Sequence, residues 1–309
     1  MLDLNALPLP DLYRRLSEGG LVRRVLEMAR DEDVGPLGDI TSRVCVPEAA
    51  EARAEIVARS AGIVCGLLIL PALMDVYGAS LDLHVKAADG EAVAAGRVLA
   101  TLHGSKRAIL TVERAALNFI GRLSGVATRT AEFGRAMNVG GPVRAKLYDT
   151  RKTTPGLRVL EKYAVRCGGG MCHRIGLFDA VLIKDNHIAG VGLGELAGFV
   201  AAAAGRAKAQ RADLRFVEVE VDSLEQLERV LTVPRGLVDI VLLDNMESEH
   251  LRRAVKMRDA SASKPELEAS GGVRLETVRA IAESGVERIS AGTLTHGAVW
   301  MDVAMDISG

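Results

Sequence analysis

The sequence predicts an α/β fold, made of an open, incomplete α/β barrel and a smaller N-terminal α+β domain. Three observations predict it. Beyond about residue 142, short runs rich in Val, Ile and Leu alternate with helix-like segments, which is typical of parallel strands joined by helices. Polar or glycine residues follow each run, as they do at the active-site end of a β/α barrel. Before residue 125, strand-like runs follow one another with little helix between them.

Six apolar runs are expected to form the parallel strands of the barrel. One segment between them shows the helical period clearly, with Leu157, Leu160 and Ala164 on one face and Arg158 and Lys162 on another. Because only six units can be counted, we expect about six or seven strands rather than eight. The predicted strands are 143–147, 180–183, 216–221, 240–243, 267–269 and 288–291, and the predicted helices between them are 157–167, 193–209, 224–231, 247–258 and 275–284.

The first 125 residues are expected to form an α+β sandwich. A helix is predicted over 12–31, a loop over 38–42, and a second helix from the capping residue Ser105 to about residue 123, closed by Gly125. The predicted strands are 52–58, 62–66, 81–85 and 97–103. We therefore expect an N-terminal domain over 1–125, a catalytic barrel over 126–296, and a C-terminal tail, 297–309, that returns to the first domain.

Composition excludes several classes of protein. The 309 residues are 49% apolar and 26% charged, which is typical of a globular chain, and only 3% are aromatic, too few for stacking on nucleic-acid bases. The longest strongly apolar stretch, 63–74, is too short to span a membrane. The four cysteines stand singly, and the first residues lack the basic segment of a secretory signal. We expect a cytoplasmic protein that binds neither nucleic acid nor membranes.

Charge is unevenly distributed along the chain. The net charge is −1, yet the segment 144–184 carries nine Lys or Arg against three Asp or Glu, a net of +6. The remainder of the chain is therefore −7. A basic focus in a near-neutral protein suits a small polyanionic ligand better than a nucleic-acid backbone.

Cations follow each of the first two predicted barrel strands and also lie between them. Arg151 and Lys152 would repel each other in a buried position unless an anion lies beside them, although a solvated loop is the commoner reading of such a pair. Their position at a strand end favours a ligand. His173 and Arg174, shortly after three consecutive glycines, are a second anion-binding candidate. Lys184 ends the next strand, where it is either a snorkelling lysine or a third cation of the site.

Carboxylates and glycines end the later strands. Glu220 and Asp244 are expected either to form ion pairs with the lysines or to hold Mg²⁺ and a ribose diol, and both roles are compatible. The glycine-bearing loops 270–272 and 291–293 match the phosphate site common in barrels, where backbone N–H groups receive an anion.

Long blocks of the sequence carry a family resemblance. The chain resembles the quinolinate phosphoribosyltransferase family, which belongs to the type II phosphoribosyltransferases, in order from Asp33 to Ser308. The matching blocks are Asp149-Thr150-Arg151-Lys152-Thr153-Thr154-Pro155-Gly156-Leu157-Arg158, 161–165, 166–170, 173–174, 184–188, and more briefly 38–42, 113–118, 243–245 and 268–272. Blocks of this length are far more specific than a single glycine motif.

The resemblance implies a reaction and an assembly. The implied enzyme is a pentosyltransferase of NAD biosynthesis that joins quinolinate to 5-phosphoribosyl-1-pyrophosphate (PRPP), giving nicotinate mononucleotide, pyrophosphate and CO₂. It would act with Mg²⁺, without an organic cofactor, as a homodimer in which Arg114 is donated to the partner's site.

The resemblance also implies roles for individual residues. Catalytic roles fall on Lys152, Lys184, Glu220 and Asp244, of which Glu220 and Asp244 also lie near the ribose and the metal. The implied substrate-binding residues are Arg114, Thr150, Arg151, Lys152, His173, Arg174, Lys184, Glu220, Asp244, Ser270, Gly271, Gly272, Ala291, Gly292 and Thr293. One position departs from the family pattern, because Cys172 stands where the family usually has Asn.

Other functions remain open at this point. A barrel lyase that forms a Schiff base on Lys184 would also place a lysine at a strand end. A related phosphoribosyltransferase with another base as acceptor, or a sensor that binds the ligands without turnover, would share most of these motifs.

Overall fold

The computed structural model describes residues 3–308, which fall into two compact units. The barrel unit contains Glu132–Lys152 and Gly170–Thr293. The sandwich unit contains Leu4–Ala131, Thr153–Gly169 and the chain from Leu294 onward. The long helix α5 (Lys106–Met137) runs across the division at residues 131 and 132.

Six parallel strands form the sheet of the barrel unit, in the order β6-β11-β10-β9-β8-β7. This order is cyclic in the sequence, as in a closed barrel, but β6 and β7 lie at opposite edges and are not paired. The predicted open α/β barrel is therefore confirmed. The strands are β6 (Lys146–Tyr148), β7 (Val181–Ile183), β8 (Val217–Val221), β9 (Ile240–Asp244), β10 (Glu266–Ser270) and β11 (Arg288–Ser290).

A short irregular segment runs along the free edge of β6. Met171 forms an isolated parallel bridge with Tyr148, its N–H donates to the Leu147 carbonyl over 2.8 Å, and its carbonyl accepts from the Asp149 N–H over 3.1 Å. These bonds satisfy edge groups that would otherwise lack partners in the sheet. The segment around Met171 thus takes the place of a seventh strand and leads into His173.

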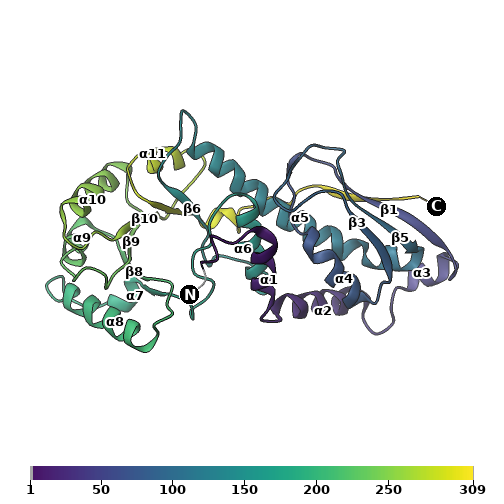
Figure 1. Ribbon diagram of the computed structural model, residues 1–309, viewed down its shortest axis with the longest axis horizontal. Helices are drawn as coiled ribbons and strands as arrows, with labels where there is room; N and C mark the ends of the chain where they lie inside the picture. Colours follow the sequence, from purple (N-terminus) through teal and green to yellow (C-terminus); the bar gives the residue numbers. More distant parts are fainter. Residues whose placement is uncertain (1–2, 309) are drawn as a thin grey trace. The chain divides into compact units, whose positions relative to one another are not determined.

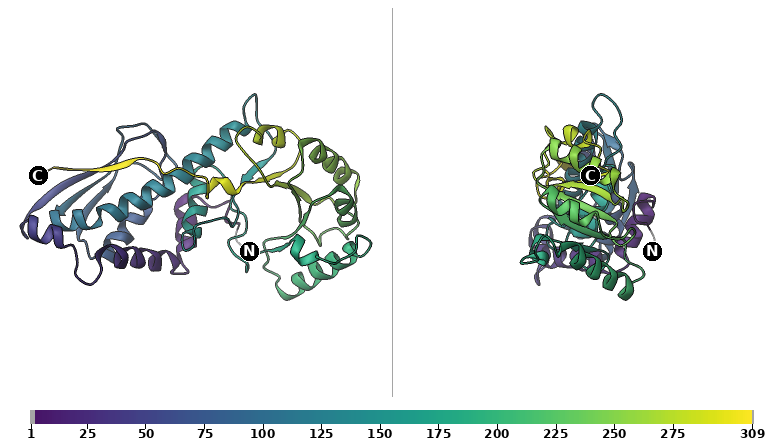
Figure 2. Two further views of the ribbon diagram at one scale, coloured as in Figure 1. Left: turned by 180° about the vertical axis from the view of Figure 1, so that it is seen from behind. Right: turned by 90° about the vertical axis from the view of Figure 1, so that its left-hand side faces the viewer.

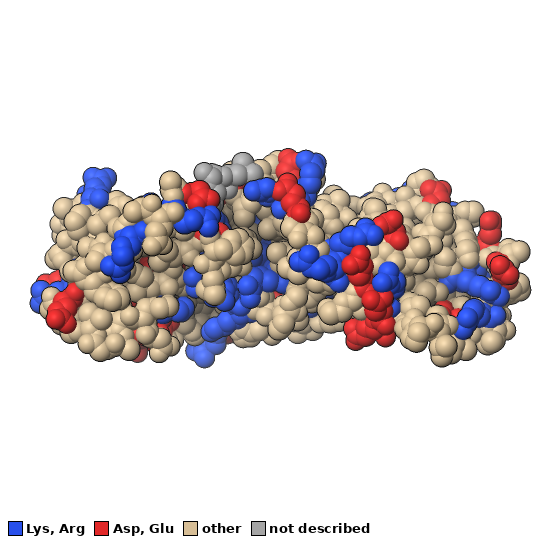
Figure 3. All heavy atoms as spheres, turned by 90° about the horizontal axis from the view of Figure 1, so that it is seen from below, with Lys and Arg blue, Asp and Glu red and all other residues tan. Residues whose placement is uncertain are grey.

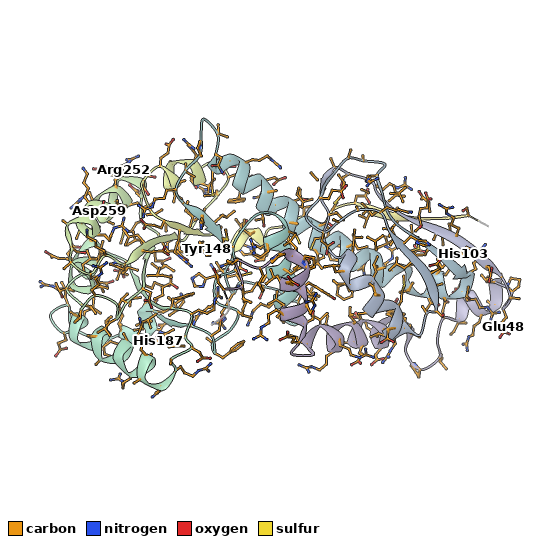
Figure 4. The ribbon with its side chains drawn as sticks, in the orientation of Figure 1. Glu48, His103, Tyr148, His187, Arg252 and Asp259 are labelled. Atoms are coloured by element: carbon orange, nitrogen blue, oxygen red, sulfur yellow. The ribbon has the colours of Figure 1, made fainter. Side chains whose placement is uncertain are left out.

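Helices cover the outer face of the curved sheet, as Figures 1 and 2 show for α8 (Leu196–Gln210), α9 (Leu224–Val230) and α10 (Ser248–Ala260). Arg252 and Asp259, labelled in Figure 4, lie exposed on α10. The shorter helices α7 (Asp185–Ile188) and α11 (Val278–Ala282) follow β7 and β10. Ser223 caps α9, since its hydroxyl accepts from the Gln226 N–H.

The sandwich unit has a four-stranded antiparallel sheet in the order β12-β1-β5-β3. The last strand of the chain, β12, pairs with β1 from Arg53 opposite Ser308 to Ala58 opposite Val303. The strands are β1 (Glu51–Ala58), β3 (Leu81–Val85), β5 (Val98–Ser105) and β12 (Val303–Ser308), with a separate pair formed by β2 (Gly62–Ile63) and β4 (Ala92–Val93). The helices are α1 (Leu9–Ser17), α2 (Leu21–Val34), α3 (Ile40–Cys45), α4 (Leu70–Tyr77), α5 and α6 (Arg158–Cys167).

Two predicted N-terminal helices differ from those observed. The helix expected over 12–31 is two helices, α1 ending at Ser17 and α2 starting at Leu21, because Gly20 between them adopts φ +69°, a left-handed conformation that interrupts the helix. The helix expected to close at Gly125 continues to Met137. A Cβ atom at Gly125 would lie 2.1 Å from the Val299 carbonyl oxygen, so this glycine serves close packing rather than termination.

The segment 153–169, expected within the barrel domain, belongs to the sandwich unit. Its helix α6 packs there through the edge-to-face rings of Tyr13 and Tyr163, 5.4 Å apart, and through Arg166, which donates to the Asn5 carbonyl. Three of the nine cations counted in the basic segment 144–184 therefore lie in the sandwich unit: Arg158, Lys162 and Arg166.

No helix within residues 3–308 is both long and apolar enough to cross a membrane. The longest, α5, carries charged side chains along its length.

Candidate active site

The predicted barrel residues gather at one end of the sheet because parallel strands share the direction of their carboxyl ends. Lys184 directly follows β7, Glu220 lies one residue before the end of β8, and Asp244 and Ser270 end β9 and β10. Asp244 and Ser270 are partners in the register of the two strands and thus lie side by side. Arg151, Lys152, Ala291, Gly292 and Thr293 follow the ends of β6 and β11 in the same unit.

The positive charges of Arg151 and Arg174 repel each other at the carboxyl ends of the barrel strands. Arg174 is buried, and burial together with the charge of Arg151 lowers the pKa of its guanidinium. Glu218, Asp179 and Glu220 oppose that shift. Holding two guanidinium groups close together in a partly desolvated place is unfavourable unless an anion accompanies them. Arg151 and Arg174 are therefore a candidate anion site, in which Glu218, Asp179 and Glu220 supply part of the opposing charge.

Protein groups clamp the main chain that carries Arg174. The His173 N–H donates to Asp149 Oδ1 over 2.8 Å. Arg215 donates to the carbonyl of His173 over 2.9 Å and to that of Cys172 over 3.1 Å. Cys172 is the position that departs from the pattern of the resemblance. Its carbonyl accepts a hydrogen bond from Arg215, and its side chain is fully buried.

Asp179 fixes the turn that follows. Its carboxylate accepts from the N–H groups of Ile175 and Gly176, over 2.8 and 2.9 Å, and forms an ion pair with Arg215 at 3.2 Å. Neither Asp179 nor Arg215 was a predicted site residue. Asp179 was visible in the sequence only as one charge in a basic segment, and Arg215 precedes its strand, so no local pattern marks either one.

The His173 ring is buried, with protein groups at both nitrogens. Its Nε2 lies 2.9 Å from Glu218 Oε2 and 3.4 Å from Glu268 Oε1, and its Nδ1 accepts the Arg174 N–H over 2.8 Å. The sequence grouped His173 with the anion-binding cations. The structure places its ring beside the buried carboxylates of Glu218 and Glu268, and its Nδ1 contacts the main chain of Arg174.

Arg288 completes this interior cluster. Its Nε donates to Glu268 Oε2 over 2.6 Å, and its guanidinium lies 3.7 Å from the ring centre of Tyr148, which is labelled in Figure 4. Although burial opposes the shift, His173 and Arg288 lower the pKa of Glu268 to about 2. Burial, and then the charge of Glu268, raise the pKa of Glu218. The two carboxyls thus differ in their readiness to ionise.

His173, Glu218 and Glu268 are the one set of three potential metal ligands found among residues 3–308, with ligand atoms within 4.8 Å of one another. The set does not fit a metal. A histidine bound through Nε2 keeps its proton on Nδ1, but here Nδ1 accepts the Arg174 N–H. Arg288 already supplies a cation to Glu268.

Lys184 and Glu220 form an ion pair at the ends of β7 and β8, in which Lys184 Nζ donates to Glu220 Oε2. The Lys184 N–H donates to Nδ1 of His187, over 2.8 Å, at the start of α7. His187, labelled in Figure 4, therefore fixes the main chain from which the lysine extends.

A cavity of about 290 Å³ opens beside this pair. Its polar lining consists mainly of carboxylates, the chemistry that Mg²⁺ prefers, while Ile188, Leu193 and Leu196 form part of an apolar wall. The carboxylates are Asp185, Glu220, Asp222 and Asp244.

The turns after β9 and β10 lock together. Asn245 adopts φ +54°, its N–H donates to the Ser270 carbonyl over 2.8 Å, and its amide donates to Asp244 over 2.7 Å. A Cβ atom at Gly271, whose φ is +87°, would lie 2.2 Å from the Asn245 side-chain oxygen. Only glycine fits that position, and with Gly272, also at positive φ, it leaves backbone accessible at the strand end.

Two further predicted residues, Thr150 and Arg114, lie in different units of the chain. Thr150 accepts the Lys152 N–H on its hydroxyl, over 3.1 Å, and so shapes the turn that carries the cations. Arg114 lies exposed on α5 in the sandwich unit, 3.8 Å from Glu113. Its predicted role in a partner's site remains a prediction.

Cations, carboxylates and a glycine turn at the strand ends define an open α/β-barrel enzyme that takes a polyanionic substrate. Comparison with known families specifies it further. The model of the quinolinate phosphoribosyl transferase C-terminal domain matches residues 126–306, and that of the N-terminal domain matches residues 39–124. The chain belongs to the quinolinate phosphoribosyltransferase family.

Individual relatives are similar to the chain over most of its length. The chain is 41% identical over 280 residues, 90% of each chain, to a probable nicotinate-nucleotide pyrophosphorylase [carboxylating] of Bacillus subtilis. It is 38% identical to the Mycobacterium leprae nicotinate-nucleotide pyrophosphorylase [carboxylating], over 92% of this chain and 96% of that one. The structure of the Francisella tularensis nicotinate-nucleotide pyrophosphorylase matches with a TM-score of 0.83 and 34% identity, covering 100% of both chains.

Proposed function

We propose that this chain transfers the phosphoribosyl group of PRPP to quinolinate and releases pyrophosphate and CO₂, giving nicotinate mononucleotide for NAD biosynthesis. The observation that carries the proposal is the gathering of Arg151, Lys152, Arg174 and Lys184 in the barrel unit, where the charge of Arg151 acts unfavourably on Arg174 and a bound anion would offset that effect. A pyridine dicarboxylate supplies two negative charges on a rigid ring. The named activity of the relatives supports the same assignment.

The chemistry follows from the charges. As the C1–pyrophosphate bond breaks, positive charge develops on the ribose, which the carboxylates of Glu220 and Asp244 stabilise. Lys152 and Lys184 offset negative charge on the substrates and the departing pyrophosphate. The pyridine nitrogen attacks C1 and becomes positively charged, so the electron pair left on the adjacent carbon when CO₂ departs is stabilised before it takes up a proton. The protein contributes chiefly position and fixed charge.

We propose that Mg²⁺ enters with PRPP and that Glu220 and Asp244 hold it. The carboxylate-lined cavity provides oxygen ligands of the kind that Mg²⁺ takes. The ion would offset the charge of the pyrophosphate group. The turns at Ser270–Gly272 and Ala291–Thr293 would receive the 5′-phosphate on backbone N–H groups.

We further propose a cytoplasmic homodimer in which Arg114 serves the partner's site. Its exposed position on α5 leaves the guanidinium accessible to another chain. Mixing Arg114→Ala and Lys152→Ala chains, each inactive alone, should restore part of the activity through heterodimers. Confirmed subunit exchange without any recovery would contradict a shared site.

Nucleic acid and membranes are not proposed as partners. A basic focus in a near-neutral chain suits a small polyanion better than a nucleic-acid backbone, and on the face drawn in Figure 3 the Lys and Arg side chains form several separate groups, some of them beside Asp and Glu. The ion pair of Lys184 with Glu220 favours an electrostatic role for this lysine over Schiff-base chemistry. Borohydride trapping of a carbonyl substrate on Lys184 would reverse that preference.

The direct test supplies PRPP and Mg²⁺ with either quinolinate or nicotinate and follows labelled CO₂, nucleotide and pyrophosphate. The proposal predicts that quinolinate yields nucleotide and CO₂ in equal amounts. Use of nicotinate but not quinolinate would show a related transferase. Tight binding of both substrates without pyrophosphate release would show a sensor.

A further inference from the structure

Asn245, at the carboxyl end of β9, has a backbone conformation that few residues with a side chain adopt. Within residues 3–308, Asn245 with φ +54° and Lys264 with φ +47° are the two non-glycine residues with positive φ. Lys264 lies just before β10, at the amino ends of the strands, whereas Asn245 directly follows Asp244 at the end that carries the site. Positive φ costs free energy, and a residue that keeps it beside a site is a candidate for a role there.

This conformation directs two donors of Asn245 to neighbouring groups. Its N–H donates to the carbonyl of Ser270 over 2.8 Å and so ties the end of β9 to the end of β10. Its side-chain amide donates to Oδ2 of Asp244 over 2.7 Å. A hydrogen bond to a carboxylate is stronger than one between neutral groups, so this bond restricts the orientation of the half-buried Asp244.

The same side chain packs against the turn after β10. A Cβ atom at Gly271 would lie 2.2 Å from Asn245 Oδ1 and 2.5 Å from its Cγ, so the amide lies directly against the backbone of this glycine. The amide therefore contacts both the carboxylate at the end of β9 and the turn Ser270–Gly272 at the end of β10. Asp244 also lines the cavity of about 290 Å³. Loss of the amide would thus release two groups of the site at once.

A residue that only shapes a turn would need positive φ and nothing more. Glycine adopts positive φ without steric cost, and Lys264 has this conformation at the other end of the sheet, so positive φ alone does not indicate a function. Asn245 differs through its amide, which reaches Asp244 and Gly271 together. Asp244 and the turn Ser270–Gly272 are the groups proposed to hold the ribose and the 5′-phosphate, which are two parts of PRPP.

We propose that Asn245 is a positioning residue for PRPP: its side-chain amide fixes Asp244 relative to the turn Ser270–Gly272, so that the ribose and the 5′-phosphate meet groups held at one spacing. Asn245 acts through these neighbours rather than by contact with the substrate. The inference rests on the proposed function for the identity of the ligand, whereas the contacts of the amide depend on the strand ends alone. Because none of these groups is proposed to bind quinolinate, the effect of Asn245 falls on PRPP.

Kinetics with a matched control test the positioning role. Asn245→Gly keeps the turn and removes the amide, so we expect the KM for PRPP to rise about tenfold or more while that for quinolinate stays within about twofold of the parent. Lys264→Gly removes the other side chain at positive φ and should leave both KM values unchanged. Asn245→Asp keeps the shape of the side chain but repels Asp244, and should also raise the KM for PRPP. The proposal is overturned if folded Asn245→Gly has the KM for PRPP of Lys264→Gly, or if its two KM values rise equally.

A second measurement needs no activity. Crystal structures of the parent and of Asn245→Gly, both without ligands, show the orientation of Asp244 directly. We expect one side-chain conformer of Asp244 in the parent and a different conformer, or several, in the variant. The parent's conformer alone in the variant would overturn the proposal even in an active enzyme. A parent that does not use PRPP would instead refute the proposed function, and a reoriented Asp244 in its variant would still show that Asn245 positions this carboxylate.

Discussion

Replacing Arg215 by alanine should both destabilise the protein and weaken its use of quinolinate. The side chain is 11% exposed and donates to two main-chain carbonyls, of His173 and Cys172, while forming an ion pair with Asp179. Each bond from a charged donor is worth about 1 kcal/mol or more, and the loss leaves a buried carboxylate with fewer partners. We expect the free energy of unfolding to fall by about 3 kcal/mol, which lowers the melting temperature of a unit of this size by about 6–12 °C.

The substitution Arg211→Ala is a matched control. Arg211 forms an ion pair with Asp213 at 2.8 Å, but both side chains are at least half exposed, so its loss should not change stability measurably. The assays are thermal unfolding by circular dichroism and the KM for quinolinate and for PRPP. Because the clamp holds the chain that carries Arg174, the KM for quinolinate should rise more than that for PRPP. If Arg215→Ala behaves like Arg211→Ala in both assays, the clamp does not position the site.

Four further outcomes are expected. Arg151→Ala should reduce the kcat/KM for quinolinate by about a hundredfold or more with little change in melting temperature, because it removes a like charge beside Arg174; an equal loss of both would contradict this. Lys184→Ala should reduce the kcat/KM similarly and also lower the melting temperature, because the buried Glu220 loses its cation. Gly125→Ala should destabilise the protein strongly, since its Cβ would lie 2.1 Å from a carbonyl oxygen, whereas Gly134→Ala, with nothing within 4 Å on the same helix, should stabilise it by up to about 1 kcal/mol. Since the pKa of Glu268 is depressed to about 2 from 4.5, its contribution to stability is complete above pH 4.5 and is lost as the pH falls toward 2, and acid unfolding of Glu268→Gln should lack that part.

The sequence alone predicted the features that depend on local pattern. The alternation of apolar runs with helical segments identified every barrel strand to within a few residues. The position of Lys184, Glu220 and Asp244 at strand ends follows directly from that alternation, because parallel strands end at one rim. These residues needed no knowledge of contacts.

Features that depend on distant contacts were not predictable in this way. Gly125 has the local signature of a helix end, and only the approach of Val299, far along the chain, shows that it serves close packing. The segment 153–169 is basic and lies between barrel strands, yet it packs with α1 through Tyr163. The cluster behind Arg174 unites Glu218 and Glu268, fifty residues apart, and is visible only once the strand register is known.

The unpaired edge of β6 has a consequence for engineering. Met171 meets that edge through one bridge rather than a full ladder, and the following chain is held by side chains instead: Asp149, Asp179 and Arg215. A closed barrel would tie this stretch to two neighbouring strands and make any redesign a problem of the whole sheet. Here, substitutions of Asp149, Asp179 and Arg215 would change the position of Arg174 without altering the sheet. Such variants are a route to enzymes for acceptor molecules whose carboxylates are spaced differently.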